Sequence, residues 1–185
     1  MSTAVEQWRD LANRYRGELP AAILLGLVDR VSGGDPSKVS ASGARGLYQI
    51  HPGTAAKLNV PAEELLDPAT STHTAVRLLT QRAAELAAAS PALEARPEDL
   101  LEMTLAAYWY GPAAILSALR AGATSSAQVW ASAAGGEKMR TFAADVLERS
   151  GRYIPIESSP REFPWAKLAG LGLLAAGILW WANRS

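Results

Sequence analysis

Apolar residues at helical spacing dominate this chain, and a glycine-rich stretch interrupts them. Apolar side chains from Ile23 to Val31 lie on one face of a predicted helix that ends at Gly33-Gly34. Between Ser32 and Gly46, the density of Gly, Ser, Asp and Pro predicts irregular backbone. No run long enough for a strand is present, so the pattern favours an all-α fold. Further helices are predicted near residues 53–58, 70–89, 97–108, 112–121, 127–133 and 137–149.

The two ends of the chain differ in character. Residues 1–20 are predicted to form an amphipathic helix, ending near Gly17, that packs on the main domain. Charges interrupt this segment and leave no apolar core for a secretory signal. Residues 151–164, with three prolines, are predicted to be a linker.

The C-terminal segment is predicted to cross a membrane at residues 165–182. From Phe163 to Ala182 its only charged residue is Lys167, whose stem can reach the interface. Residues 168–182 alone would span about 22 Å at ~1.5 Å per residue, short of a ~30 Å hydrocarbon core, so the residues before them are needed. Trp165 and Trp180-Trp181 suit an aromatic belt. A buried hairpin and an interfacial helix are the alternatives.

Composition narrows the functional classes. Eighteen basic and eighteen acidic side chains give a net charge of zero, so no nucleic-acid partner is expected. The chain has no cysteine, and its two histidines, His51 and His73, lie in unrelated contexts. Neither a metal site nor another cofactor is therefore expected. Gly172 and Ala176 form a small-x-x-x-small pair, which leaves the oligomeric state open.

Three short segments resemble sequence motifs of a known protein family. Residues 32–40 read Ser-Gly-Gly-Asp-Pro-Ser-Lys-Val-Ser, residues 43–49 read Gly-Ala-Arg-Gly-Leu-Tyr-Gln, and residues 105–112 read Leu-Ala-Ala-Tyr-Trp-Tyr-Gly-Pro. Together they resemble the motifs of the soluble lytic transglycosylase family, and the likeness covers about Ala21 to Ser150. It implies a lysozyme-like α domain at 21–150 that cuts peptidoglycan. Ser71, Trp109 and Phe142 depart from the family's usual Asn, Asn and Tyr.

The most consequential departure is at position 31. In the family, a single Glu there protonates the bond between N-acetylmuramic acid and N-acetylglucosamine, then takes the muramyl C6 hydroxyl proton as a 1,6-anhydro ring closes. Val31 has no proton to give, whether the Glu was replaced or deleted from the alignment. General acid/base catalysis contributes ~10²–10⁴-fold, so activity is expected to be impaired. Asp29, about 200° around the helix, is expected to face solvent, and Asp35 to satisfy a turn.

Four residues match positions that line the family's sugar cleft, and the resemblance implies glycan contact for them: Ser32, Ser40, Gln49 and Tyr108. Trp109 stands at a further cleft position, where the family usually has Asn, and is also a candidate for substrate binding. Turn or cap formation is the alternative for the two serines. For Tyr108 the alternative is core packing. Trp109 could supply a sugar platform or fill the groove. Gly43 and Gly46 are expected to permit the turn that positions Gln49.

The sequence thus predicts a membrane-anchored, peptidoglycan-processing protein with impaired catalysis. Its partners are expected to be peptidoglycan strands and, through 165–182, the membrane of a bacterial envelope or of a phage virion. The missing signal peptide and the hydrophobic tail favour a virion protein. A catalytically inactive glycan-binding or virion structural module is the alternative, and an introduced Val31 in an otherwise active enzyme is a third hypothesis.

Overall fold

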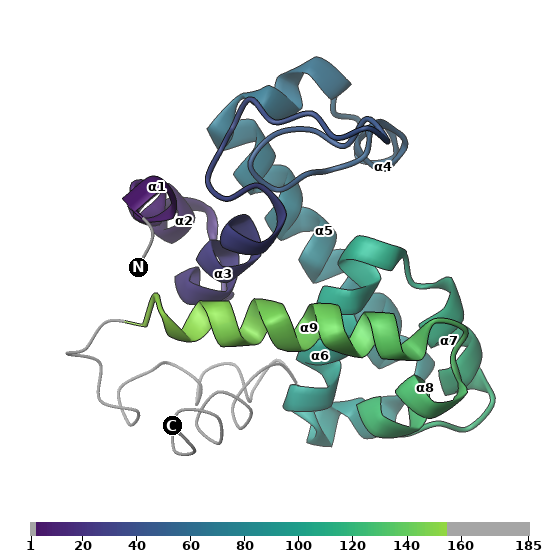
Figure 1. The fold of residues 1–185 in the computed structure, drawn as a ribbon. Coiled ribbons are helices and arrows are strands. Elements are labelled where there is room, and N and C mark those ends of the chain that lie inside the picture. The colour runs from purple at the N-terminus through teal and green to yellow at the C-terminus, as the bar shows by residue number, and fades with distance from the viewer. Residues whose placement is uncertain (1–2, 155–185) are drawn as a thin grey trace. The chain divides into compact units, whose positions relative to one another are not determined.

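The computed structural model describes residues 3–154, and every regular element in that range is a helix (Figure 1). The predicted all-α class is thereby confirmed for the described residues. Within them, extended pairing is limited to the isolated bridges of Arg45 with Val39 and Ile50. The elements in order are α1 (Thr3–Glu6), α2 (Arg9–Tyr15), α3 (Ala21–Val31), α4 (Pro52–Lys57), η1 (Ala62–Leu66), α5 (Pro68–Ala89), η2 (Pro91–Ala95), α6 (Pro97–Tyr110), α7 (Ala113–Arg120), α8 (Ser126–Ser132) and α9 (Gly136–Gly151).

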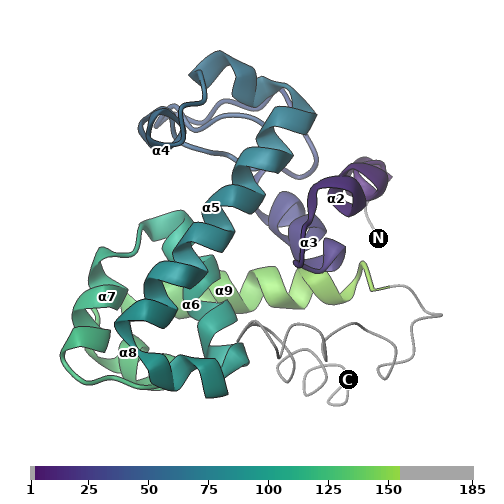
Figure 2. The ribbon, with the colours of Figure 1, turned by 180° about the vertical axis from the view of Figure 1, so that it is seen from behind.

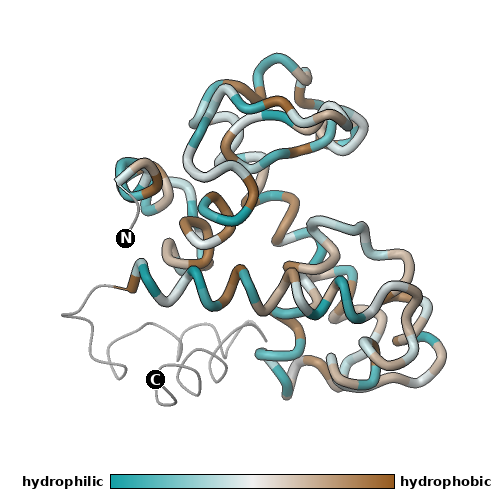
Figure 3. The backbone as a smooth tube through the Cα atoms, in the orientation of Figure 1, coloured by the Kyte–Doolittle hydropathy of each residue, from teal (hydrophilic) through white to brown (hydrophobic). Residues whose placement is uncertain are grey.

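The described residues divide into two compact units. The first unit comprises residues 3–78 and 146–154, and the second comprises residues 79–145. The long helices α5 and α9 contribute residues to both. Hydrophilic and hydrophobic residues alternate along α9 at helical spacing (Figure 3), and its apolar residues Met139, Phe142 and Val146 are buried.

The N-terminal region forms two short helices rather than the single predicted helix. The break falls at Gln7 and Trp8, between α1 and α2, and both helices contact α3 (Figure 2). The Trp8 indole Nε1 donates a hydrogen bond to the Gly34 carbonyl at 2.9 Å. Arg9 pairs with Glu6 and donates to the Tyr153 carbonyl at 2.9 Å. These contacts span 26 and 144 residues of sequence, so helical periodicity alone does not predict the break.

Helix α3 is the central apolar element of the first unit. Its residues from Ala22 to Val28 are all buried. Gly26 lets its backbone lie against Ser150 at the end of α9, because a Cβ on Gly26 would lie 2.7 Å from the Ser150 nitrogen. The prediction that Asp29 faces solvent is wrong. Its side chain is only 13% exposed, because Arg149 and Arg152 pair with it at 3.4 and 3.7 Å.

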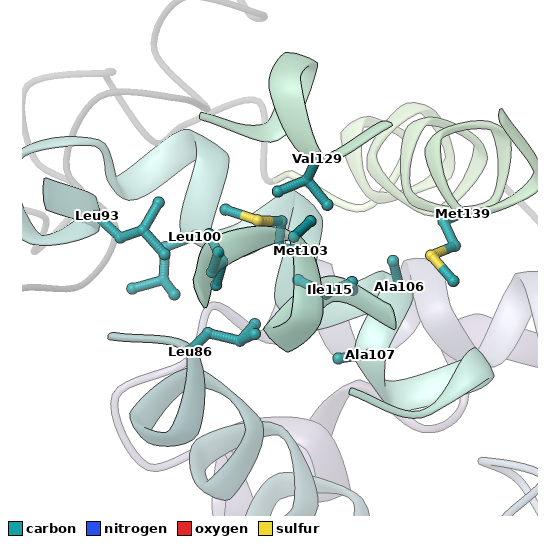
Figure 4. Packing of buried hydrophobic residues seen from close by; sticks show 11 residues of the cluster. Leu86, Leu93, Leu100, Met103, Ala106, Ala107, Ile115, Val129 and Met139 are labelled. Atoms are coloured by element: carbon teal, nitrogen blue, oxygen red, sulfur yellow. The ribbon is translucent and has the colours of Figure 1, made fainter. Parts of the chain in front are cut away.

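The core of the second unit combines leucines with small residues. Leu86, Leu93 and Leu100 meet at one end of the cluster, and Met139 closes the other beside Ala106 and Ala107 (Figure 4). Alanines let helices approach closely at native packing density. Ala106 and Ala107 of α6 are fully buried in this core.

No helix in residues 3–154 is both long enough and apolar enough to cross a bilayer. The predicted transmembrane segment 165–182 and the greater part of the predicted linker 151–164 lie outside the described residues. Within the described start of that linker, the Tyr153 side chain is fully buried.

Candidate functional site

Position 31 combines an apolar side chain with a neighbouring cation. Val31 is the last residue of α3, and its side chain is 5% exposed. The Lys38 ammonium donates a hydrogen bond of 2.7 Å to the Val31 carbonyl. A cation at a helix C-terminus stabilises the unpaired carbonyls and the helix dipole. The position that the resemblance assigns to the acid thus holds an isopropyl group beside a positive charge.

Ser32 is the C-terminal capping residue of helix α3. Its Oγ donates to the Val28 carbonyl at 3.1 Å and accepts from the Gly34 N–H at 3.2 Å. The residue is buried, with both hydrogen bonds made to backbone. This geometry matches the interpretation of Ser32 as a cap, and glycan contact by Ser32 remains a prediction.

Gln49 fixes the irregular loop from within. Its Nε2 donates to the carbonyls of Lys38 at 2.9 Å and Gly46 at 3.0 Å, and its side chain is buried. The backbone of Gln49 is left-handed, with φ of 48°. Since that conformation is uncommon for a residue with a Cβ, the two side-chain hydrogen bonds help to hold it. The Gln49 amide nitrogen therefore organises the loop.

Two glycines shape the turn before Gln49. Gly46 has φ of 75°, and a Cβ there would overlap the Leu65 carbonyl oxygen and lie 2.9 Å from its carbon. Gly43 has φ of 85°, but open space surrounds its missing Cβ. Arg45 between them exchanges two backbone hydrogen bonds with Ile50, at 3.0 and 3.1 Å. The close approach of Gly46 to η1 thus sets the path of the chain into Gln49.

Ser40 closes the neighbouring turn. Its Oγ accepts from the Ala44 N–H at 3.0 Å and lies 3.1 Å from the Ser42 Oγ. Its carbonyl accepts from the Gly43 N–H at 2.9 Å. As with Ser32, these bonds match turn formation, and the Ser40 side chain is still partly accessible.

Asp35 is poorly suited to replace the missing acid. Its Oδ1 accepts hydrogen bonds from the Ser37 hydroxyl at 2.7 Å and the Ser37 N–H at 2.8 Å. These two hydrogen bonds, with the hydroxyl contributing most, lower the pKa of the Asp35 carboxyl below its ordinary value. The carboxylate therefore stays ionised at neutral pH and serves the turn, as the sequence predicts.

The second unit carries the two aromatic candidates. Tyr108 is buried, in agreement with the core-packing alternative. Trp109 and Tyr110 are 40% and 45% exposed. The Trp109 ring stacks on Phe142 with centroids 5.2 Å apart and an interplanar angle of 16°. Tyr110 meets the same phenyl ring edge-on, at 6.0 Å and 83°.

The structure links the first-unit candidates through a residue that sequence reasoning missed. This residue is Lys38, whose ammonium donates a hydrogen bond to the Val31 carbonyl. The backbone carbonyl of Lys38 accepts hydrogen bonds from Gln49 Nε2 and, at 3.0 Å, from the Gly46 N–H. The sequence feature that could have pointed to Lys38 is a cation between Pro36 and Val39, seven residues after position 31. Tyr108 and Trp109 belong to the other unit.

Within residues 3–154, no group of three or more His, Asp or Glu side chains is arranged to hold a metal ion. The candidate residues of the first unit are backbone turns, hydroxyl and amide groups and one lysine, and those of the second unit are aromatic rings.

Comparison with known proteins gives one family model and a similar solved structure. The family model described as the transglycosylase SLT domain matches residues 9–131. The crystal structure of the 70 kDa soluble lytic transglycosylase of Escherichia coli is similar, with a TM-score of 0.60 and 23% identity over 79% of this chain. The match covers 24% of that enzyme's chain. A comparison with curated proteins found no similar sequence.

Gly46→Ala and Gly43→Ala provide a matched test of the turn. Both residues have a positive φ, but only at Gly46 would a Cβ strike backbone. Gly43→Ala is expected to cost about 1–2 kcal/mol of unfolding free energy from its conformation alone. Gly46→Ala is expected to cost more than about 3 kcal/mol. Urea unfolding measures both, and equal losses would contradict the close approach to Leu65.

Proposed function

Because the chain belongs to the transglycosylase SLT domain family, we propose that it is a peptidoglycan-processing protein whose cleavage step is impaired. The observation that carries this proposal is the contrast around position 31. Ser32 and Gln49 hold the loop between them by hydrogen bonds to its backbone, yet the side chain that precedes this loop is the buried Val31. In this proposal the chain binds glycan strands but lacks the proton donor.

The chemistry explains why the loss matters. The family's reaction needs one group that first gives a proton to the glycosidic oxygen and then accepts one from the muramyl C6 hydroxyl. A carboxyl group of raised pKa can do both, whereas the Val31 side chain can do neither. Asp35 is committed to its turn, and Asp29 is paired with Arg149 and Arg152. Neither of these carboxylates is thus available as a substitute.

A catalytically inactive module for glycan binding or virion structure is the second candidate. Two observations favour it: the burial of Val31, which suits a stable core better than an active site, and the Trp109 ring exposed on its Phe142 support. The two candidates differ in whether restoring an acid at position 31 restores cleavage.

A Val31→Glu variant distinguishes the two candidates. We expect the full-length variant to release fragments with 1,6-anhydromuramic ends from purified peptidoglycan at least about 100-fold faster than the native chain. Mass spectrometry of the soluble products measures this release. Val31→Gln, which has a similar shape but no titratable proton, is the control and should remain inactive. If Val31→Glu folds normally and releases nothing, the inactive module is the better account.

Lys38 is expected to set the pH profile of that variant. A carbonyl oxygen lies roughly 3 Å from the Cβ of its own residue, so the ammonium bonded to the Val31 carbonyl lies within reach of a carboxylate at position 31. A neighbouring cation favours the ionised carboxylate, which cannot act as a general acid.

Val31→Glu should therefore be most active at acidic pH. Adding Lys38→Met should move the alkaline limb of the activity profile upward by roughly one pH unit. The profile of kcat/KM against pH measures the shift. Val31→Glu with Lys38→Arg keeps the positive charge and serves as the control, and an unchanged limb in the Lys38→Met double variant would contradict the proposed charge effect.

We also propose, on the sequence alone, that residues 165–182 anchor the chain in a bacterial envelope or virion membrane. The expected result is that the full-length chain floats with lipid vesicles in a density gradient. Leu174→Arg places a charge near the middle of the segment, at a cost of about 2.5–3.5 kcal/mol, and should reduce the floating fraction. Alanine at the same position is the control. Sedimentation of the native chain away from the vesicles would refute the anchor.

A further inference from the structure

The Trp109 indole is supported on one face by Phe142, and the residue is still well exposed. Phe142 lies almost parallel beneath it, with centroids 5.2 Å apart and 16° between the planes, and is itself buried. Trp109 is nevertheless 40% exposed. A stacked ring keeps its orientation, so a ligand that packs on the face opposite Phe142 does not have to immobilise a freely rotating side chain.

The backbone at this point also fixes the ring. Trp109 lies in the last turn of α6, which ends at Tyr110 and is capped by Gly111 with φ of 82°. The Gly111 N–H closes that turn on the Ala107 carbonyl at 3.0 Å. Tyr110, whose ring meets Phe142 edge-on, stands beside it and is 45% exposed. Both exposed rings are thus held by one buried phenyl group.

The small area of this surface limits the size of the ligand that can bind to it. Among the described residues of the second unit, the exposed large apolar side chains are Trp109 and Tyr110. Two side chains cannot supply the roughly 800 Å² that each partner contributes to a standard protein interface. A ligand of about the size of one aromatic ring fits better.

The chemistry of the surface favours a sugar ring. The face of an aromatic ring carries partial negative charge, and the axial C–H bonds on one side of a pyranose are weakly positive. The hydroxyl and acetamido groups at the edge of the pyranose can stay hydrated while that side covers the indole. A hexosamine unit of a glycan strand meets both conditions.

We propose that the face of Trp109 opposite Phe142, flanked by Tyr110, is a stacking platform for one pyranose ring of a peptidoglycan glycan strand. This inference rests on the proposed function and deepens it, because it names a sugar-binding residue in the second unit. It also favours the platform over the groove-filling alternative for Trp109. The platform provides binding energy without taking part in proton transfer.

Binding of a soluble β-1,4-linked N-acetylglucosamine tetrasaccharide to the full-length chain tests the platform. Isothermal titration calorimetry is expected to show that Trp109→Ala weakens binding about tenfold, while Trp109→Phe, which keeps a stacking ring, loses less than about threefold. Trp130→Phe is the matched control and should bind normally. Trp130 packs against the second unit's core, and its indole nitrogen has no hydrogen-bond partner among the described residues.

A pull-down of the same proteins with insoluble peptidoglycan distinguishes failure of the Trp109 platform from failure of the proposed function. If the native chain binds peptidoglycan and Trp109→Ala binds the tetrasaccharide as tightly as the native chain does, the platform is refuted and the proposed function stands. Equal losses for Trp109→Phe and Trp109→Ala would also refute stacking. If the native chain binds neither ligand, the proposed function itself fails.

Discussion

The hydrogen bond from the Lys38 ammonium to the Val31 carbonyl is the interaction on which the site depends. It joins the end of α3 to the irregular loop, and the Lys38 carbonyl extends the connection by accepting from Gln49 Nε2 and from the Gly46 N–H. One residue therefore sets the position of the helix end, the buried amide and the glycine turn at once. Gly46 completes the arrangement because only a residue without a Cβ fits against Leu65.

The conformation of this loop does not depend on the side chain at position 31. Ser32, Ser40 and Gln49 use their polar atoms largely to hold backbone, so the loop does not require a carboxylate at position 31 to keep its form. An apolar side chain at that position avoids the cost of burying an unpaired charge. The form of the loop therefore does not depend on an acid at position 31.

Much of the fold is predictable from the sequence, because helix periodicity and glycine positions are local signals. The end of α3 at Val31 and the all-α class follow from them, and the motif resemblance identifies the family. What sequence reasoning missed depends on contacts between distant segments. The pairing of Asp29 with Arg149 and Arg152, and the support of Trp109 by Phe142, join residues more than thirty positions apart. The role of Lys38 depends on a side-chain conformation that spacing does not specify.

The most direct test of the central claim, that the chain retains the family's glycan-binding fold without its acid, uses the full-length native protein and purified peptidoglycan in one sample. The fraction of protein bound and the number of new 1,6-anhydromuramic ends are measured together over time. The account predicts saturable binding with no ends formed above those in protein-free buffer. Formation of such ends in proportion to the bound protein would contradict it, because another residue would then supply the proton.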